Sequence, residues 1–112
     1  EEAAVRGLKE AGYRIVARNW RDGRDRREEI DLIARDGDIL VFVEVKARAE
    51  GARVDGYASV TAAKKRILRR AIAAYLKSLR KPPAGWRFDI VGVTLREGRS
   101  LTTRHFPNIP LG

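Results

Sequence analysis

Two carboxylates and a lysine interrupt a pair of apolar segments in the first half of the chain. Residues 29–36 and 39–46 are rich in isoleucine, leucine and valine, yet they carry Asp31, Glu44 and Lys46. A carboxylate in such a segment is costly to bury unless a cation compensates its charge. Mg²⁺ would do so, and a metal held by two carboxylates can promote phosphodiester hydrolysis. A nearby ammonium group can orient the attacking water or stabilise the charge that develops on phosphate.

The spacing of the two segments predicts a β-hairpin. Gly37-Asp38 suits a two-residue turn, because glycine accepts positive φ. If Asp36 and Ile39 flank that turn, Asp31 lies opposite Glu44, with Cβ atoms about 4.5–5.5 Å apart. Lys46 then shares the face of Glu44. The face away from these charges is wholly apolar and should pack on the core: Ile30, Leu32, Ala34, Val41, Val43 and Val45.

The residues alone leave two interpretations of this hairpin equally open. One is a metal site formed by Asp31 and Glu44, and the other is a cross-strand cluster of salt bridges. Ile33, Leu40 and Phe42 share the charged face and make it mixed rather than fully polar. Glu29 precedes Asp31 by two residues and could join a metal site, although an ion pair with neighbouring arginines is the favoured role.

The other segments predict a mixed α/β fold. Apolar residues recur at helical spacing over residues 1–11 and from Thr61 to about Leu79, where Thr61 is the expected N-cap. Strand patterns cover residues 13–18 and 86–95, a short strand is expected over 101–106, and residues 21–27 and 47–59 are expected to be loops. This order predicts a mixed sheet flanked by helices in a single domain spanning residues 1–112.

Composition points to a polyanionic partner. The chain of 112 residues has a net charge of +9, which fits nucleic acid. It has no cysteine and no apolar run long enough to span a bilayer, so we expect a cytoplasmic protein with no membrane partner. Basic side chains near the hairpin are the candidate phosphate contacts: Arg21, Arg24, Arg26, Arg27, Arg48, Arg53, Lys64 and Lys65.

Four further residues are expected to have structural or incidental roles. Asp89 lies beside arginines in the strand over 86–95 and is expected to pair with one of them. His105 is expected to be incidental, and Trp20 and Trp86 are expected to anchor the core.

In several segments the chain resembles the YraN family. These segments are Gly12-Tyr13, Arg18-Asn19, Glu29-Ile30-Asp31-Leu32-Ile33, Val41-Phe42-Val43-Glu44-Val45-Lys46-Ala47-Arg48, Lys64 and Arg87-Phe88-Asp89, together with Glu1, Ala4 and Leu8. That family is placed in the PD-(D/E)xK nuclease superfamily and is similar to archaeal Holliday-junction resolvases. The family usually has glycine where this chain has Glu28, which leaves the bend at the strand entry open.

The resemblance implies a restriction-endonuclease-like αβββαβ core, a four- to five-stranded sheet and a Mg²⁺- or Mn²⁺-dependent site. Asp31 and Glu44 correspond to its metal acids and Lys46 to its lysine, while Glu1 corresponds to an accessory acid. The backbone carbonyl of Val45 corresponds to a further ligand.

Three functional hypotheses follow. The first is a metal-dependent endonuclease that acts on DNA, with branched or single-stranded DNA as candidate substrates and a homodimer as a candidate assembly. The second is a nucleic-acid-binding protein that retains the fold without cleaving. The third is a protein-interaction adaptor whose charge is incidental.

Overall fold

The sheet is built around a parallel pair of long strands joined by a helix. The computed structural model describes residues 1–23, 29–52 and 60–112. The elements in order are α1 (Glu2–Glu10), β1 (Arg14–Arg21), β2 (Glu29–Asp36), β3 (Ile39–Ala49), α2 (Ala62–Ser78), β4 (Gly85–Arg96) and β5 (Arg99–Phe106). The strands lie in the order β1-β2-β3-β4-β5, with β3 and β4 parallel and the other neighbours antiparallel. Helix α2 makes the crossover that a parallel pair requires.

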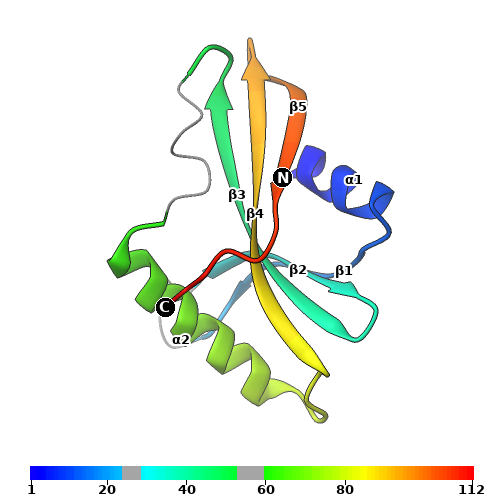
Figure 1. The fold of residues 1–112 in the computed structure, drawn as a ribbon, viewed down its shortest axis with the longest axis vertical. Coiled ribbons are helices and arrows are strands. Elements are labelled where there is room, and N and C mark those ends of the chain that lie inside the picture. Colours follow the sequence, from blue (N-terminus) through cyan, green and yellow to red (C-terminus); the bar gives the residue numbers. More distant parts are fainter. Residues whose placement is uncertain (24–28, 53–59) are drawn as a thin grey trace.

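The two helices cover opposite faces of this sheet (Figure 1). We call the buried cluster under α2 the α2-side core; its members include Ile33, Leu40, Phe42, Leu68, Ile72, Tyr75, Phe88 and Ile90. The α1-side core includes Ala4, Val5, Leu8, Leu32, Ala34, Val41, Val43, Val91 and Val93. Strands β3 and β4 contribute to both cores, which explains why their sequences are apolar at consecutive positions. The fold class expected from the sequence is confirmed.

The predicted hairpin is confirmed in its turn and its register. Asp36 pairs with Ile39 across the turn, and Gly37 has a φ of 61°. The pairing continues to Leu32 and Val43, one step short of Asp31 and Glu44. The apolar residues that share the charged face are fully buried in the α2-side core, because α2 covers that face as well.

Three predicted boundaries are wrong. Residues 47–49 extend β3 instead of entering a loop, because they pair with Val93, Thr94 and Leu95 of β4. Strand β1 continues to Arg21, and β5 already begins at Arg99. The N-cap of α2 is as predicted: the Thr61 hydroxyl accepts a hydrogen bond from the Lys64 N–H at 3.1 Å.

The face of the sheet toward which the side chains of β2 point reverses at Asp31. Alternate residues of a strand face the same side, so Ile30 should share the face of Leu32. Instead Ile30 packs in the α2-side core and Leu32 in the α1-side core, which corrects the predicted facing of Ile30. In β1, Arg18 pairs with Leu32 and Trp20 with Ile30, so the residue across from Asp31 is Asn19. Asn19 has a φ of 50°, a left-handed conformation that bends β1 at the same level.

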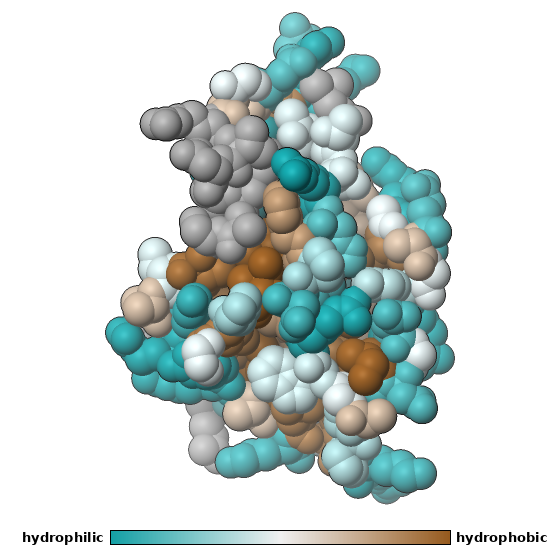
Figure 2. All heavy atoms as spheres, viewed as in Figure 1, coloured by the Kyte–Doolittle hydropathy of each residue, from teal (hydrophilic) through white to brown (hydrophobic). Residues whose placement is uncertain are grey.

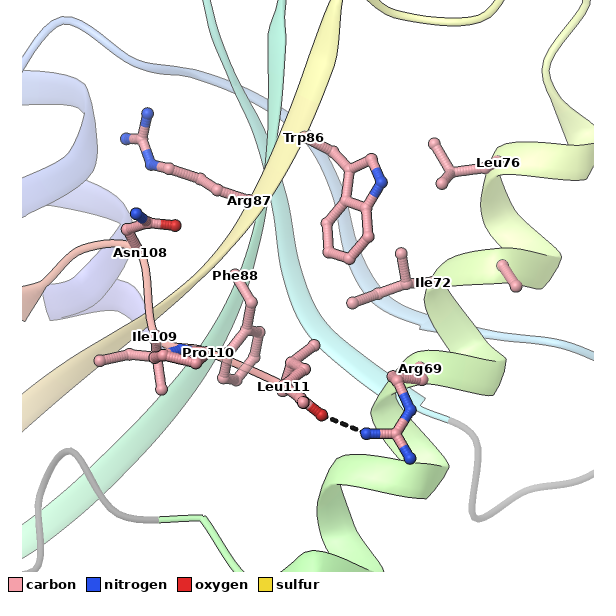
Figure 3. Close-up of a pocket in the computed structure, with 12 residues that line it drawn as sticks. Arg69, Ile72, Leu76, Trp86, Arg87, Phe88, Asn108, Ile109, Pro110 and Leu111 are labelled. Carbon is pink, nitrogen blue, oxygen red and sulfur yellow. Dashed lines mark hydrogen bonds between the residues drawn. The ribbon is translucent and has the colours of Figure 1, made fainter.

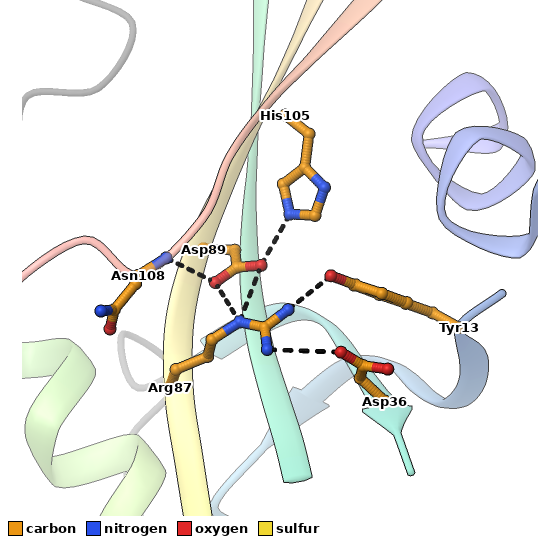
Figure 4. Close-up of polar contacts among 6 residues, drawn as sticks. All are labelled: Tyr13, Asp36, Arg87, Asp89, His105 and Asn108. Carbon is orange, nitrogen blue, oxygen red and sulfur yellow. Dashed lines mark hydrogen bonds and ion pairs between the residues drawn. The ribbon is translucent and has the colours of Figure 1, made fainter. Parts of the chain in front are cut away.

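A buried carboxylate of β4 connects this strand to β5 and to the residues that follow β5. Asp89 is fully buried and contacts three groups (Figure 4). It accepts hydrogen bonds from Arg87 Nε at 3.1 Å and the backbone N–H of Asn108 at 2.9 Å, and its Oδ2 lies 2.6 Å from His105 Nε2. Arg87 also contacts the hydroxyl of Tyr13, the residue that precedes β1. The predicted Asp89–arginine pair is confirmed, and His105 has a structural partner that the sequence did not predict.

We expect Asp89→Ala to lower the free energy of unfolding by about 3 kcal/mol, since it leaves the partners of a buried carboxylate uncompensated. The matched control is Asp36→Ala, which removes an exposed carboxylate 3.5 Å from the same arginine. That change should cost about 1 kcal/mol or less. Urea unfolding followed by circular dichroism measures both. Equal costs for the two variants would show that Asp89 is no more important than a surface ion pair.

Candidate functional site

The point where β2 leaves β3 brings two carboxylates together. Beyond the last paired residues, Leu32 and Val43, the Asp31 side chain accepts a hydrogen bond from the backbone N–H of Val45 at 2.8 Å. The side chain of Asp31 thus satisfies a main-chain donor of β3. We call this place, where Asp31 and Val45 lie beyond the last β2–β3 pair, the fork. This bond also orients the carboxylate toward the segment that carries Glu44 and Lys46.

Lys64 of α2 contacts the Glu44 side chain. Its Oε1 lies 3.4 Å from Lys64 Nζ, and the Glu44 side chain is only 16% exposed. Lys64 belongs to the first turn of α2, which Thr61 caps, so the positive end of the helix dipole also faces this region. Lys46 lies half-buried two residues further along β3. The site therefore combines two acids with lysines from a strand and a helix.

Burial and repulsion both act on Asp31. Its removal from water raises the pKa of Asp31, the hydrogen bond from Val45 opposes that rise, and the charges of Glu44, Glu1 and Glu29 add to it. The carboxylates of Glu44 and Asp31 are therefore close enough to repel each other. Such a group is stabilised in its charged form by any cation that comes to lie between the two acids.

The two accessory acids lie at the edge of this site. Glu1 is the exposed N-cap residue of α1, and its Oε1 accepts a hydrogen bond from Asn19 Nδ2 at 3.2 Å. That contact ties the start of α1 to the bend opposite Asp31. Glu29 forms an ion pair with Arg21 at 3.4 Å, which confirms the favoured role for Glu29.

The predicted phosphate contacts are only partly described. Arg24, Arg26, Arg27 and Arg53 lie outside the described residues. Arg21 and Arg48 are exposed on β1 and β3, and Lys65 is half-buried on α2 beside Lys64. Basic side chains of β1, β3 and α2 are thus present around the fork.

The donor set at the fork suits a hard divalent cation. No group of three or more histidine, cysteine, aspartate or glutamate side chains with metal-binding geometry occurs in residues 1–23, 29–52 and 60–112. Mg²⁺ does not require one, since it commonly takes one or two carboxylates and leaves its other positions to water and phosphate. Asp31 and Glu44 could supply those two carboxylates, and a shared cation would relieve the repulsion that acts on Asp31. The carbonyl of Val45 as a third ligand stays a prediction.

Sequence reasoning missed the exposed position of Trp86, which was expected in the core. Its side chain is 43% exposed at the start of β4, and its ring meets Phe42 edge to face at a centroid distance of 5.8 Å. Trp20 does pack against the α2-side core, where its ring meets Tyr75. No local pattern predicts this exposure, because Trp86 begins the apolar segment that predicts a strand over 86–95.

The fold is that of a mixed α/β protein with the element order of a restriction-endonuclease-like core, and the candidate site lies where β2 leaves β3. The chain belongs to the family described as Uncharacterised protein family UPF0102, which residues 1–93 match.

Among its relatives, a UPF0102 protein of Chlorobaculum tepidum is 47% identical over 83% of this chain and 70% of its own length. A UPF0102 protein of Symbiobacterium thermophilum is 50% identical over 83% of this chain and 76% of its own length. One of Streptomyces coelicolor is 42% identical over 94% of this chain and 80% of its own length. In the part of the chain that the structure describes, neither helix has the length and apolarity needed to cross a membrane.

We expect Asp31→Asn to stabilise the metal-free protein at neutral pH. Folding raises the pKa of Asp31, so the folded state binds the proton more tightly than the unfolded chain. Stability therefore falls as pH rises from the ordinary aspartate value of 3.8 through the raised one. The increase in the free energy of unfolding caused by Asp31→Asn should be complete at pH values above the raised pKa of Asp31. It should vanish as pH approaches 3.8.

Chemical unfolding in EDTA across this pH range measures the difference. Asp38→Asn, which changes an exposed carboxylate in the hairpin turn, is the control and should alter stability by less than about 0.5 kcal/mol at each pH. A loss of stability in Asp31→Asn that is independent of pH would contradict the prediction.

Proposed function

We propose that this protein is a metal-dependent nuclease that hydrolyses phosphodiester bonds in DNA. The observation that carries the proposal is the placement of Asp31 and Glu44 at the strand fork, close enough to repel each other, with Lys46 and Lys64 beside them. The resemblance to the YraN family and to the PD-(D/E)xK superfamily supports the same conclusion. We take branched or single-stranded DNA as the substrate class, and the cytoplasm as the expected location.

Each residue of the site has a distinct role in this proposal. Asp31, oriented by Val45, and Glu44 would hold Mg²⁺ or Mn²⁺ together with the Val45 carbonyl. The metal, when bound, lowers the pKa of water and polarises the phosphate. Lys46 orients the attacking water or stabilises the added negative charge on phosphorus. Lys64 can exchange its contact with Glu44 for one with a substrate phosphate, and Arg48 extends the positive surface along β3.

The charge of the protein supports a nucleic-acid substrate. The net charge is +9, and exposed arginines lie on β1, β3 and α2. Cations placed so broadly bind the phosphate backbone without regard to sequence. Coordinated cleavage of two strands would require a second copy of the site, and a homodimer would provide it.

A cleavage assay tests the proposal. Purified protein is incubated with supercoiled, single-stranded and four-way-junction DNA in Mg²⁺, Mn²⁺ or EDTA. We expect cleavage only with metal, and a loss of about 100-fold or more in Glu44→Gln and Lys46→Ala. Glu50→Gln is the matched control, because Glu50 is an exposed carboxylate just past β3 that pairs with Arg96. Cleavage retained in Glu44→Gln and Lys46→Ala would refute the site assignment.

A second candidate function is nucleic-acid binding without cleavage. The ion pair between Glu44 and Lys64 favours it, since a lysine compensates the Glu44 charge in the absence of any metal. Salt-sensitive binding to DNA with no cleavage in either metal would select this function. A DNA interaction that is absent or insensitive to salt would exclude both candidates.

A further inference from the structure

A pocket lies on the α2 side of the sheet, away from the fork. Its volume is about 400 Å³, within the range of small-molecule sites. Three parts of the chain form it: α2, the start of β4 and the tail after β5 (Figure 3). Ile72 and Leu76 of α2 face the Trp86 ring, and Phe88 and Leu111 lie deeper between the helix and the sheet. We call it the Trp86 pocket.

The tail that forms one wall is fixed in place. The N–H of Asn108 donates to Asp89, and the N–H of Ile109 donates to the Phe88 carbonyl at 2.7 Å. Further along, Arg69 of α2 donates a hydrogen bond to the Leu111 carbonyl. The pocket is therefore a built feature of the fold, held by contacts from β4 and α2. Apolar surface lies between α2 and the tail, and hydrophilic atoms cover the outer side of the helix (Figure 2).

A positive hollow adjoins this pocket. Arg66, Arg69 and Arg70 lie on one exposed face of α2 and line a hollow of about 350 Å³ together with Ala73. Arg69 and Ala73 line both spaces, so the two are neighbours on α2. No aspartate or glutamate side chain is among the described residues that line either space. Three guanidinium groups beside one another attract an anion, and here that anion would enter next to an exposed aromatic ring.

The Trp86 pocket and the fork lie on the same side of the sheet. In the parallel pair, Trp86 lies next to Leu40 and Ile90 lies next to Glu44. Four residues of β3 separate the two places, which corresponds to about 13 Å along the strand. The basic face of α2 runs between them, from Lys64 at Glu44 to Arg69 at the pocket. One polyanion could therefore contact both.

We propose that the Trp86 pocket binds one unpaired base of a single-stranded nucleic acid, while Arg66, Arg69 and Arg70 hold the neighbouring phosphates. An aromatic ring accepts the face of a base, and adjacent arginines neutralise the backbone. The pocket has space for a nucleobase, most of its lining residues are apolar, and the charges at its mouth match phosphate. This inference deepens the proposed function, because it makes single-stranded segments the preferred substrate class.

Binding to fluorescent oligonucleotides in EDTA tests the inference separately from cleavage. Trp86→Ala should weaken binding of a short oligothymidine by about 5- to 100-fold, the loss typical of one stacked base. Trp86→Phe should retain most of the affinity. An oligonucleotide of the same length without bases should bind wild type and Trp86→Ala equally, and so should duplex DNA.

Two controls sharpen the result. Val16→Ala changes another large exposed apolar side chain, on β1, and should leave all affinities unchanged. Arg66→Gln and Arg70→Gln should each reduce the dependence of log K on log salt by about 0.7 for every phosphate that is no longer neutralised. If Trp86→Ala does not fold, the comparison of Trp86→Phe with Trp86→Leu, checked by circular dichroism, replaces it, and only the leucine variant should bind oligothymidine weakly.

The inference is overturned if Trp86→Ala binds oligothymidine as tightly as wild type, or if its affinity falls equally for duplex and base-free strands. Failure of the proposed function gives a different pattern. In that case no metal supports cleavage, yet Trp86→Ala still selectively weakens single-strand binding. Glu50→Gln should bind oligothymidine like wild type, because Glu50 pairs with Arg96, at the opposite end of β4 from Trp86.

Discussion

The parallel pairing of β3 with β4 is the constraint on which the rest of the structure depends. These strands pair from Ile39 and Gly85 to Ala49 and Leu95, whereas β2 pairs with β3 only as far as Leu32 and Val43. Parallel neighbours need a crossover, which is α2, and they need cover on both faces, which α1 and α2 provide. Because β3 extends beyond its pairing with β2, its later residues meet side chains instead of a neighbouring backbone. Asp31 accepts a hydrogen bond from one of these main-chain donors, the N–H of Val45.

The site thus arises from a change of partner along one strand. Up to Val43, β3 is a core strand with neighbours on both edges. From Glu44 onward β3 carries charged side chains, and the acids at the fork have polar partners. Val45 orients Asp31, Lys64 neutralises Glu44, and Asn19 holds Glu1 near the bend. Polar groups at a fork remain accessible to ligands while the surrounding core holds them in fixed positions.

Local patterns predicted the hairpin because its information is local. Gly37 determines the turn, and the alternation on either side determines the register as far as Leu32 and Val43, one step short of Asp31 and Glu44. The reversal at Ile30 did not, since it depends on the left-handed Asn19 in a neighbouring strand. Likewise Ala47, Arg48 and Ala49 have no strand pattern of their own and are ordered by β4. The contact of His105 with Asp89 joins strands β4 and β5, and the exposure of Trp86 depends on where α2 packs.

The ion pair between Lys64 and Glu44 acts as an internal competitor. Any cation that binds Glu44 must first share or displace the ammonium group, so its apparent affinity is lower than the carboxylates alone would give. A polyanion that draws Lys64 toward itself removes this competition. The two ligands are then coupled, and by thermodynamic reciprocity each raises the affinity of the protein for the other. A single lysine in the first turn of α2 could in this way weaken cation binding at the acids until a phosphate backbone is bound.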